Sequence, residues 1–149
     1  MSTTIRSLYD QDFYAWTQQN ARLIREGRLS DCDLDHIAEE IESMGASERR
    51  QLSSRLEILL MHLLKWQYQP ALRGRSWQLT IKEQRRKIGD LLAENPSLKT
   101  PVNLDQVIRK AYQYAIIRAE IETGLLEESF PQTCPYSWAQ IIDESYYPE

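Results

Sequence analysis

Apolar residues recur at helical spacing along most of the chain, and the pattern predicts about five main helices. The most regular stripe steps alternately by four and three residues, through Leu52, Leu56, Leu59, Leu63 and Trp66. It predicts a long helix over residues 47–68, which Pro70 ends. Only residues 77–81 alternate as a strand would, and the charged helical run that follows them favours a helix there as well.

Two shorter helices are expected before the long one. The first covers residues 10–26 and is ended by Gly27. The second covers residues 34–44, with Asp33 as its N-cap and Gly45 as its stop. Its core-facing side is expected to consist of Leu34, Ile37, Ile41 and Met44.

Two long helices and a short one are expected after Pro70. Ser76 is expected to cap a helix over residues 76–93, and Asn103 to cap one that ends at Gly124. A short helix over 137–143 follows. The short loops imply antiparallel neighbours, so the expected fold is all-α: a single-domain bundle of about five main helices with a short C-terminal helix.

Length and composition bound the domain organisation and the location. The 149 residues fit one domain, with flexible ends expected at 1–8 and 146–149. No apolar run approaches the roughly 20 residues that cross a bilayer, and the N-terminus has no apolar signal core, so a cytoplasmic location is expected. The two cysteines, Cys32 and Cys134, are interpreted as reduced structural thiols.

Charge is distributed in three blocks. Residues 1–45 carry −5, residues 46–92 carry +6 and residues 93–149 carry −5, which sum to the net charge of −4. Either the acidic flanks neutralise the basic centre within the fold, or the centre meets an anionic partner. The net negative charge favours internal neutralisation, with the acidic helix over 34–44 lying against the basic helix over 76–93.

The basic centre supplies candidate nucleic-acid ligands. Arginine presents a planar fork that suits phosphate, and tryptophan can stack on a base. The candidates are Arg73, Arg75, Lys82, Arg85, Arg86 and Trp77. The alternative interpretation is that the tryptophans are core residues and the cations are internally paired.

Four residues form a hypothetical catalytic group. His62 lies among apolar residues of the long helix and could activate water, although a half-buried histidine bonded to a backbone carbonyl is the simpler interpretation. Glu39 and Glu42 share a helical face with Asp35 and could bind a divalent cation, or could simply be solvated or salt-bridged. Arg85 would then hold a phosphate. His36 and Glu40 are interpreted as an exposed pair.

The chain contains none of the common catalytic fingerprints. A phosphate loop, a GxSxG elbow, paired CxxC motifs, a dinucleotide fingerprint and HExxH are all missing from the sequence. We therefore expect no cofactor and assign no metal site.

Several spaced motifs resemble one family. They are LYDQDFYAW at 8–16, LDHIAEEIESMG at 34–45, HLLKWQYQP at 62–70, SWQLTIKEQR at 76–85, NPSL at 95–98 and the tail FPQTCPYSW. Over nearly the whole chain they resemble the domain-of-unknown-function 29 family, which is all-helical, found mainly in cyanobacteria and some proteobacteria, and uncharacterised. The polar residues that match its pattern are Asp12, Glu39, Glu40, Glu42, His62, Lys65, Ser76, Thr80, Gln84 and Arg85.

Two functions are compatible with these observations. The first is a non-enzymatic adaptor that binds a protein partner, with the tail aromatics as a docking segment: Tyr136, Trp138, Tyr146 and Tyr147. The second is a nucleic-acid-binding protein or small metal-dependent nuclease that uses the region of His62, Arg85 and Glu39. Arg85 distinguishes them, since its reversal to Glu should lower stability if it is internally neutralised.

Overall fold

The structure is a computed structural model that describes residues 8–149, so the flexible end expected at 1–8 lies outside the described residues except for Leu8. All regular elements of the described part are helical, which confirms the all-α fold class. None of the described helices combines the length and the apolar character needed to cross a bilayer.

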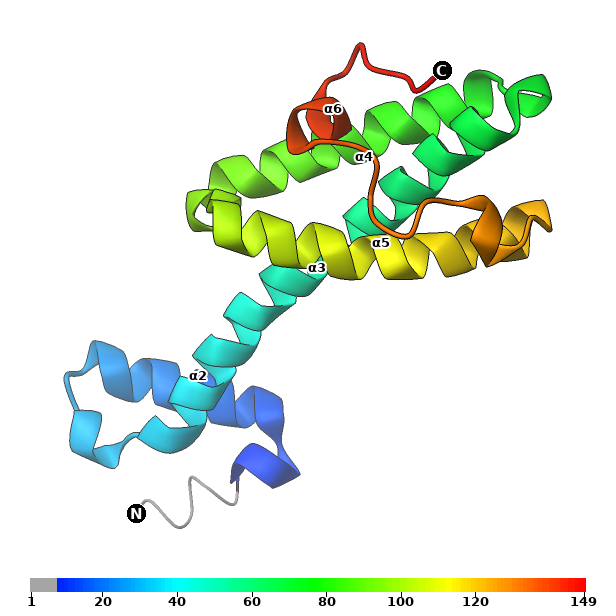
Figure 1. Cartoon of the computed structure of the whole chain (residues 1–149). Helices are drawn as coiled ribbons and strands as arrows, with labels where there is room; N and C mark the ends of the chain where they lie inside the picture. Colours follow the sequence, from blue (N-terminus) through cyan, green and yellow to red (C-terminus); the bar gives the residue numbers. More distant parts are fainter. Residues whose placement is uncertain (1–7) are drawn as a thin grey trace. The chain divides into compact units, whose positions relative to one another are not determined.

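The main helices follow one another in Figure 1 as α2 (Phe13–Arg25), α3 (Leu34–Tyr68), α4 (Arg75–Glu94), α5 (Pro101–Thr123) and the short α6 (Trp138–Ile142). Residues 8–11 form a further helical turn before α2. Short 3₁₀ turns lie in the connections: η1 (Leu29–Asp31), η2 (Pro70–Leu72), η3 (Pro96–Lys99) and η4 (Glu127–Ser129).

Helix α3 runs without interruption through Gly45, so the expectation that Gly45 stops a helix and Ser47 restarts one was wrong. A glycine inside a helix costs only about 0.5–1 kcal/mol relative to alanine, and no proline follows it. Among the described glycines only Gly27 and Gly124 have a positive φ, and these two do end helices. A glycine therefore stops a helix here only where its backbone is left-handed.

The helix caps agree with the sequence at some ends and differ at others. Asp12 caps α2 by accepting from the N–H of Ala15 at 3.0 Å, and Ser137 caps α6. Helix α5 starts earlier than expected, because Thr100 caps it and Pro101 occupies its first turn. Asn103 instead donates to the carbonyl of Leu98. Ser76 is likewise not a cap, since α4 begins at Arg75.

Contacts divide the chain into two compact units, Met1–Ser47 and Glu48–Glu149. In the first, α2 and η1 pack with the first turns of α3 around three buried apolar residues: Trp16, Leu23 and Cys32. Ile37 packs against this cluster, but the rest of the expected core-facing side is exposed, with Leu34 at 53%, Ile41 at 63% and Met44 at 66%. That expectation was wrong, because of its four residues only Ile37 packs on this small cluster.

In the second unit the later part of α3 packs with α4 and α5 around a larger core. The predicted α3 stripe is confirmed, since Leu52, Leu56, Leu59 and Leu63 are fully buried and Trp66 is partly buried against them. Helix α4 contributes Ile81, Ile88, Leu91 and Leu92, whereas its Leu79 is 49% exposed. The single folding domain over 1–149 stays a prediction.

The segment after α5 crosses the second unit and ends against it, as the orange and then red trace in Figure 1 shows. The aromatic residues that were expected to dock on a partner pack instead on the chain's own core: Tyr136, Trp138, Tyr146 and Tyr147. Tyr112 fixes the segment by donating to the carbonyl of Pro131 at 2.7 Å, and Tyr136 does so by donating to Gln67 at 2.7 Å. The end at 146–149, expected to be flexible, is placed against this core.

Candidate functional site

His62 lies half-buried on α3 and adopts the simpler of its two expected roles. Its Nδ1 lies 2.8 Å from the carbonyl oxygen of Ile58, one turn earlier. Burial lowers the pKa of its imidazole, with a smaller contribution from nearby Lys65. A neutral histidine whose Nδ1 is already used has only Nε2 left for chemistry. His62 is thus a half-buried residue of α3, and no carboxylate of the described residues lies within hydrogen-bonding distance of its ring.

Arg85 lies inside the second unit and is only 4% exposed. Its Nε donates to the carbonyl of Ile141 at 2.7 Å and its Nη2 to the carbonyl of Gln140 at 3.2 Å. The guanidinium also lies 5.6 Å from the ring centre of Tyr147. These contacts correct two expectations, because Arg85 is not a surface phosphate ligand and its hydrogen-bonding partners are backbone carbonyls rather than helical carboxylates.

Arg73 and Trp77, two further nucleic-acid candidates, also have internal partners. The Nε of Arg73 donates to the carbonyl of Trp66 at 2.7 Å, and its guanidinium lies 5.2 Å from that ring. The Nζ of Lys65 lies 4.8 Å from the ring centre of Trp77 and 2.9 Å from Oε1 of Glu122. One face of Trp77 is thus occupied by a cation of its own chain, which leaves less of the indole to stack on a base.

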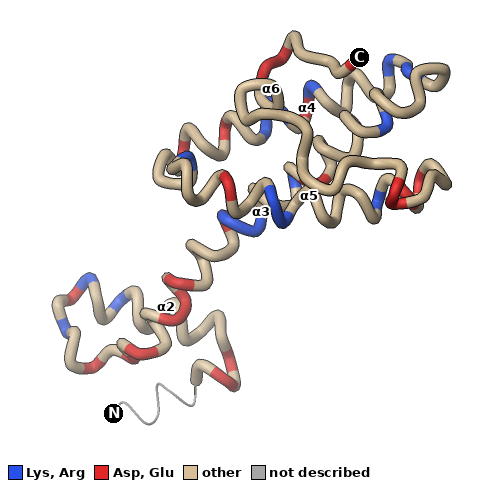
Figure 2. Tube along the Cα trace, in the orientation of Figure 1, with Lys and Arg blue, Asp and Glu red and all other residues tan. Residues whose placement is uncertain are grey.

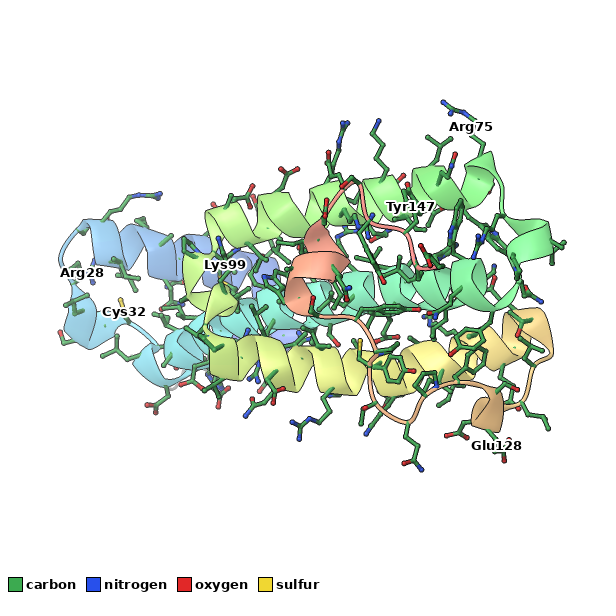
Figure 3. The ribbon with its side chains drawn as sticks, turned by 45° about the horizontal axis from the view of Figure 1, so that its top comes forward. Arg28, Cys32, Arg75, Lys99, Glu128 and Tyr147 are labelled. Atoms are coloured by element: carbon green, nitrogen blue, oxygen red, sulfur yellow. The ribbon has the colours of Figure 1, made fainter. Side chains whose placement is uncertain are left out.

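Three of the basic candidates remain exposed on α4. Arg75, Lys82 and Arg86 fall close to one line along the helix, and Arg75 points away from the bundle in Figure 3. Arg86 lies 3.6 Å from Glu144, an ion pair that is well exposed on both sides. Arg75 and Lys82 have no ion-pair partner among the described residues. The basic stripe therefore exists without Arg85 in it.

The carboxylates proposed to bind a metal lie on the part of α3 that belongs to the first unit. Glu39 and Glu42 are exposed there, while His62 and Arg85 belong to the second unit. In residues 8–149 no three histidine, cysteine or acidic side chains are grouped so that they could hold a metal ion. The geometry of the described residues therefore gives the nuclease hypothesis no metal centre.

A polar cluster in the first unit was missed by sequence reasoning. His36 was expected to pair with Glu40, but its Nδ1 lies 2.6 Å from Oδ2 of buried Asp33, and its ring stacks on Tyr9 at 3.9 Å. The indole of Trp16 donates to the same carboxylate oxygen at 3.0 Å. Glu40 instead accepts a hydrogen bond from the hydroxyl of Tyr9, which raises the tyrosine pKa to about 12.

These hydrogen bonds determine the charge state of the cluster. The bond to Asp33 raises the pKa of His36, against an opposing effect of burial. Burial acts to raise the pKa of Asp33, but the bonds from His36 and Trp16 outweigh it and lower that pKa. The three-residue spacing of Asp33 and His36 was the available signal, whereas nothing local in the sequence pointed to Tyr9. The cluster fastens residues 8–11 to α3.

A comparison with protein-family models gives one match, to a domain of unknown function named DUF29, over residues 8–147. The chain belongs to the DUF29 family. Neither a curated protein nor a solved structure matches it. Many of the polar residues that fit the DUF29 pattern have structural partners here: Asp12 caps α2, Lys65 pairs with Glu122, and Arg85 holds α6. In this DUF29 chain those positions maintain the fold.

Exposed apolar side chains are concentrated in the first unit. Its described part buries three apolar residues and exposes seven large ones: Phe13, Tyr14, Ile24, Leu29, Leu34, Ile41 and Met44. At about 100° per residue, Leu34 and Ile41 lie on one line of α3 with Ala38 and Gly45 close to it. An exposed apolar patch with a polar border is typical of a binding surface.

An acidic edge borders this apolar line on α3. Glu39 and Glu42 lie about 140° and 80° around the helix from Leu34, on the side away from Ile37. Figure 2 shows acidic residues, drawn in red, along the first turns of α3. The described first unit thus presents an apolar strip with a negative border, and we call this strip and border the α3 face.

Proposed function

We propose that this DUF29 domain is a non-enzymatic adaptor whose α3 face binds a protein partner. The observation that carries the proposal is the exposure of Leu34 and Ile41 on one line of α3 beside an acidic edge. Removing such side chains from water on binding is favourable by about 25 cal/mol per Å² of apolar surface. The tail aromatics are not part of this surface, since they pack on the second unit.

The α3 face fits a basic amphipathic helix. Exposed Leu34 and Ile41, seven residues apart on one helix, match the i and i+7 spacing of a partner's apolar residues. The first unit carries nine acidic and four basic side chains in its sequence, which favours a partner with Lys or Arg along one flank. The partner class is therefore a helix with an apolar stripe and a cationic edge.

A synthetic peptide tests this function. A helical peptide with leucines at i, i+3, i+4 and i+7 and lysines beside them should bind the full chain, measured by calorimetry. Ile41→Glu should weaken binding by about tenfold or more, because it places a charge in the centre of the strip. Ile24→Glu is a matched control, since Ile24 is also an exposed isoleucine but lies on α2.

Two results would contradict the adaptor function. Equal affinity of the peptide for the wild type and for Ile41→Glu would show that the α3 face does not bind the peptide. If a peptide with the same leucines but with glutamates in place of lysines bound as tightly as the lysine peptide, the acidic edge would have no role in binding. Circular dichroism of each variant establishes that the helices are retained.

Binding of nucleic acid is a second candidate function, favoured by exposed Arg75 and Lys82, which lack ion-pair partners among the described residues. A short labelled single-stranded RNA, followed by fluorescence anisotropy at low salt, tests it. Arg75→Glu combined with Lys82→Glu should abolish binding, and affinity should fall steeply with added salt. Unchanged anisotropy of the RNA with wild-type protein would exclude this function.

A further inference from the structure

Two cavities lie on the second unit on either side of Trp138, the first residue of α6. The first has a volume of about 560 Å³, and its walls come from η3, α5 and the crossing segment. The second has a volume of about 570 Å³ and lies between α4, η3 and α6. Both are lined by Trp138 and Lys99, so they adjoin one another. Each has the size of a small-molecule site.

The first cavity has an apolar floor. Leu104 and Tyr136 are buried beneath it, and Ile108, Cys134 and Trp138 are partly buried around it. The hydroxyl of Tyr136 is already committed to Gln67, at 2.7 Å. Burial raises the pKa of the Cys134 thiol, which keeps it protonated and unreactive. The floor therefore offers contact area for an apolar group and little polar chemistry.

Charge is found at the rim, and one cation there is unpaired. Arg109 and Asp105, one turn apart on α5, neutralise each other through a contact of 2.8 Å. Lys99 is exposed at the corner between α4 and α5, as Figure 3 shows, and has no ion-pair partner among residues 8–149. The first cavity thus combines an apolar interior with a net positive charge at its edge.

The second cavity adds further cations on the other side of Lys99. Arg85 and Arg86 line it, opposed by Asp90 and by Glu144, which pairs with Arg86. Without Lys99 these two cations face two carboxylates, so the net positive charge shared by both cavities is that of Lys99. Buried Arg85 also has its Nη1 without a hydrogen-bond partner in the described structure. Both cavities therefore favour negative charge at the place where they adjoin.

We propose that these cavities bind an anionic amphiphile, with its apolar body over Leu104 and Ile108 and its anionic head at Lys99. The apolar body removes Ile108 and Trp138 from water, and the head pairs with a cation that has no other partner. This site lies in the second unit and is independent of the α3 face and of the proposed adaptor function.

Dodecanoate is the probe, added to the full chain below its micelle concentration. The indole N–H resonance of Trp138, assigned with Trp138→Phe, should shift on saturation, while that of buried Trp16 should not. Dodecanol, which has the same chain without the charge, should bind about tenfold or more weakly, and dodecyltrimethylammonium more weakly still. Equal affinities for the three probes would overturn the role assigned to Lys99.

Variants locate the two parts of the site. Lys99→Glu should weaken the binding of dodecanoate by about tenfold or more and leave the binding of dodecanol nearly unchanged. Lys110 is an exposed α5 residue outside both cavities, so Lys110→Glu should change the affinity for neither probe. Ile108→Trp should fill the cavity and weaken both probes. If Ile108→Trp proves unfolded by circular dichroism, Ile108→Asp takes its place, and the Trp138 resonance in the wild type remains an independent measurement.

Three outcomes would overturn the proposal. They are the absence of a Trp138 shift at millimolar dodecanoate, full binding to folded Ile108→Trp or Ile108→Asp, and binding only to phosphatidylglycerol vesicles with none to monomeric dodecanoate. The last outcome would show that the positive charge of Lys99 binds a membrane surface rather than a ligand in the cavity. None of them bears on the peptide that tests the α3 face.

Discussion

The Nε of Arg85 donates a hydrogen bond of 2.7 Å to the carbonyl oxygen of Ile141, which ties α4 to α6 across the second unit. A second bond, from Nη2 to the carbonyl of Gln140, uses the other edge of the same guanidinium. Both carbonyls lie at a helix that is only five residues long. Arg85 thus stabilises a helix that is too short to persist alone.

Arg85→Met should lower the free energy of unfolding by about 2–4 kcal/mol, because bonds from a charged group are worth about 1.5–3 kcal/mol and the Ile141 carbonyl loses its partner. Arg85→Glu should lower the free energy of unfolding further, because it buries a negative charge beside carbonyl oxygens. Arg86→Met is the matched control and should remain within about 0.5 kcal/mol, because its side chain is 62% exposed. Urea unfolding of the three variants measures this, and equal losses at both positions would contradict the assignment.

Two glycines should respond in opposite directions to alanine. Gly45 lies within α3 and an added Cβ meets no atom within 4 Å, so Gly45→Ala should stabilise the chain by about 0.5–1 kcal/mol. Gly124 ends α5 with φ of 76°, which alanine adopts only with strain, so Gly124→Ala should destabilise it. Thermal denaturation gives both signs. A destabilised Gly45→Ala would mean that α3 is interrupted at this position after all.

The chain's two histidines should titrate on opposite sides of the ordinary value of about 6.5. The hydrogen bond to Asp33 raises the pKa of His36, and burial lowers the pKa of His62. Nuclear magnetic resonance of the imidazole protons across the range of about pH 5–8 resolves both midpoints, with His36→Gln and His62→Gln for assignment. A His36 midpoint at or below that of His62 would contradict the Asp33 contact.

Stability should follow these shifts with opposite signs. The stabilisation from protonated His36 is fully present below about pH 6.5 and is lost as the pH rises through its higher folded-state pKa. His62 favours folding above about pH 6.5, and that contribution is lost as the pH falls toward its lower folded-state pKa. Compared with the wild type, His36→Gln should therefore have a lower free energy of unfolding mainly at the acidic end of about pH 5–8. His62→Gln should lose less stability than the wild type as the pH falls.

Glu122→Gln should destabilise the chain more than Lys65→Met. The Nζ of Lys65 is nearly buried beneath Trp77 and depends on Glu122, whereas the carboxylate of Glu122 is 43% exposed and can be solvated. Losing the carboxylate leaves a poorly hydrated cation, at a cost of about 1–2 kcal/mol given this partial exposure. A double-mutant cycle on unfolding free energies isolates the pair. A larger loss for Lys65→Met would show that side-chain packing under Trp77 dominates.

Much of the helical pattern could be predicted from residues a few positions apart in the sequence. The stripe from Leu52 to Leu63 predicted both the helix and its buried side, because a step of four and three residues returns to the same face of a 3.6-residue helix. Gly27 and Gly124 ended helices as expected. Gly45 did not, since glycine marks a stop only where the neighbouring segments favour a left-handed turn.

The sequence by itself determined the helix class, the main helical segments, the buried stripe of α3 and membership of the DUF29 family. Only the tertiary structure decided that Arg85 lies inside, that His36 pairs with Asp33 rather than Glu40, and that Ile41 stays exposed while Ile37 is partly buried. Periodicity depends on residues a few positions apart. Which stripe is covered, and which cation bonds to a carbonyl, depends on contacts such as that between Arg85 and Ile141, which lie 56 residues apart in the chain.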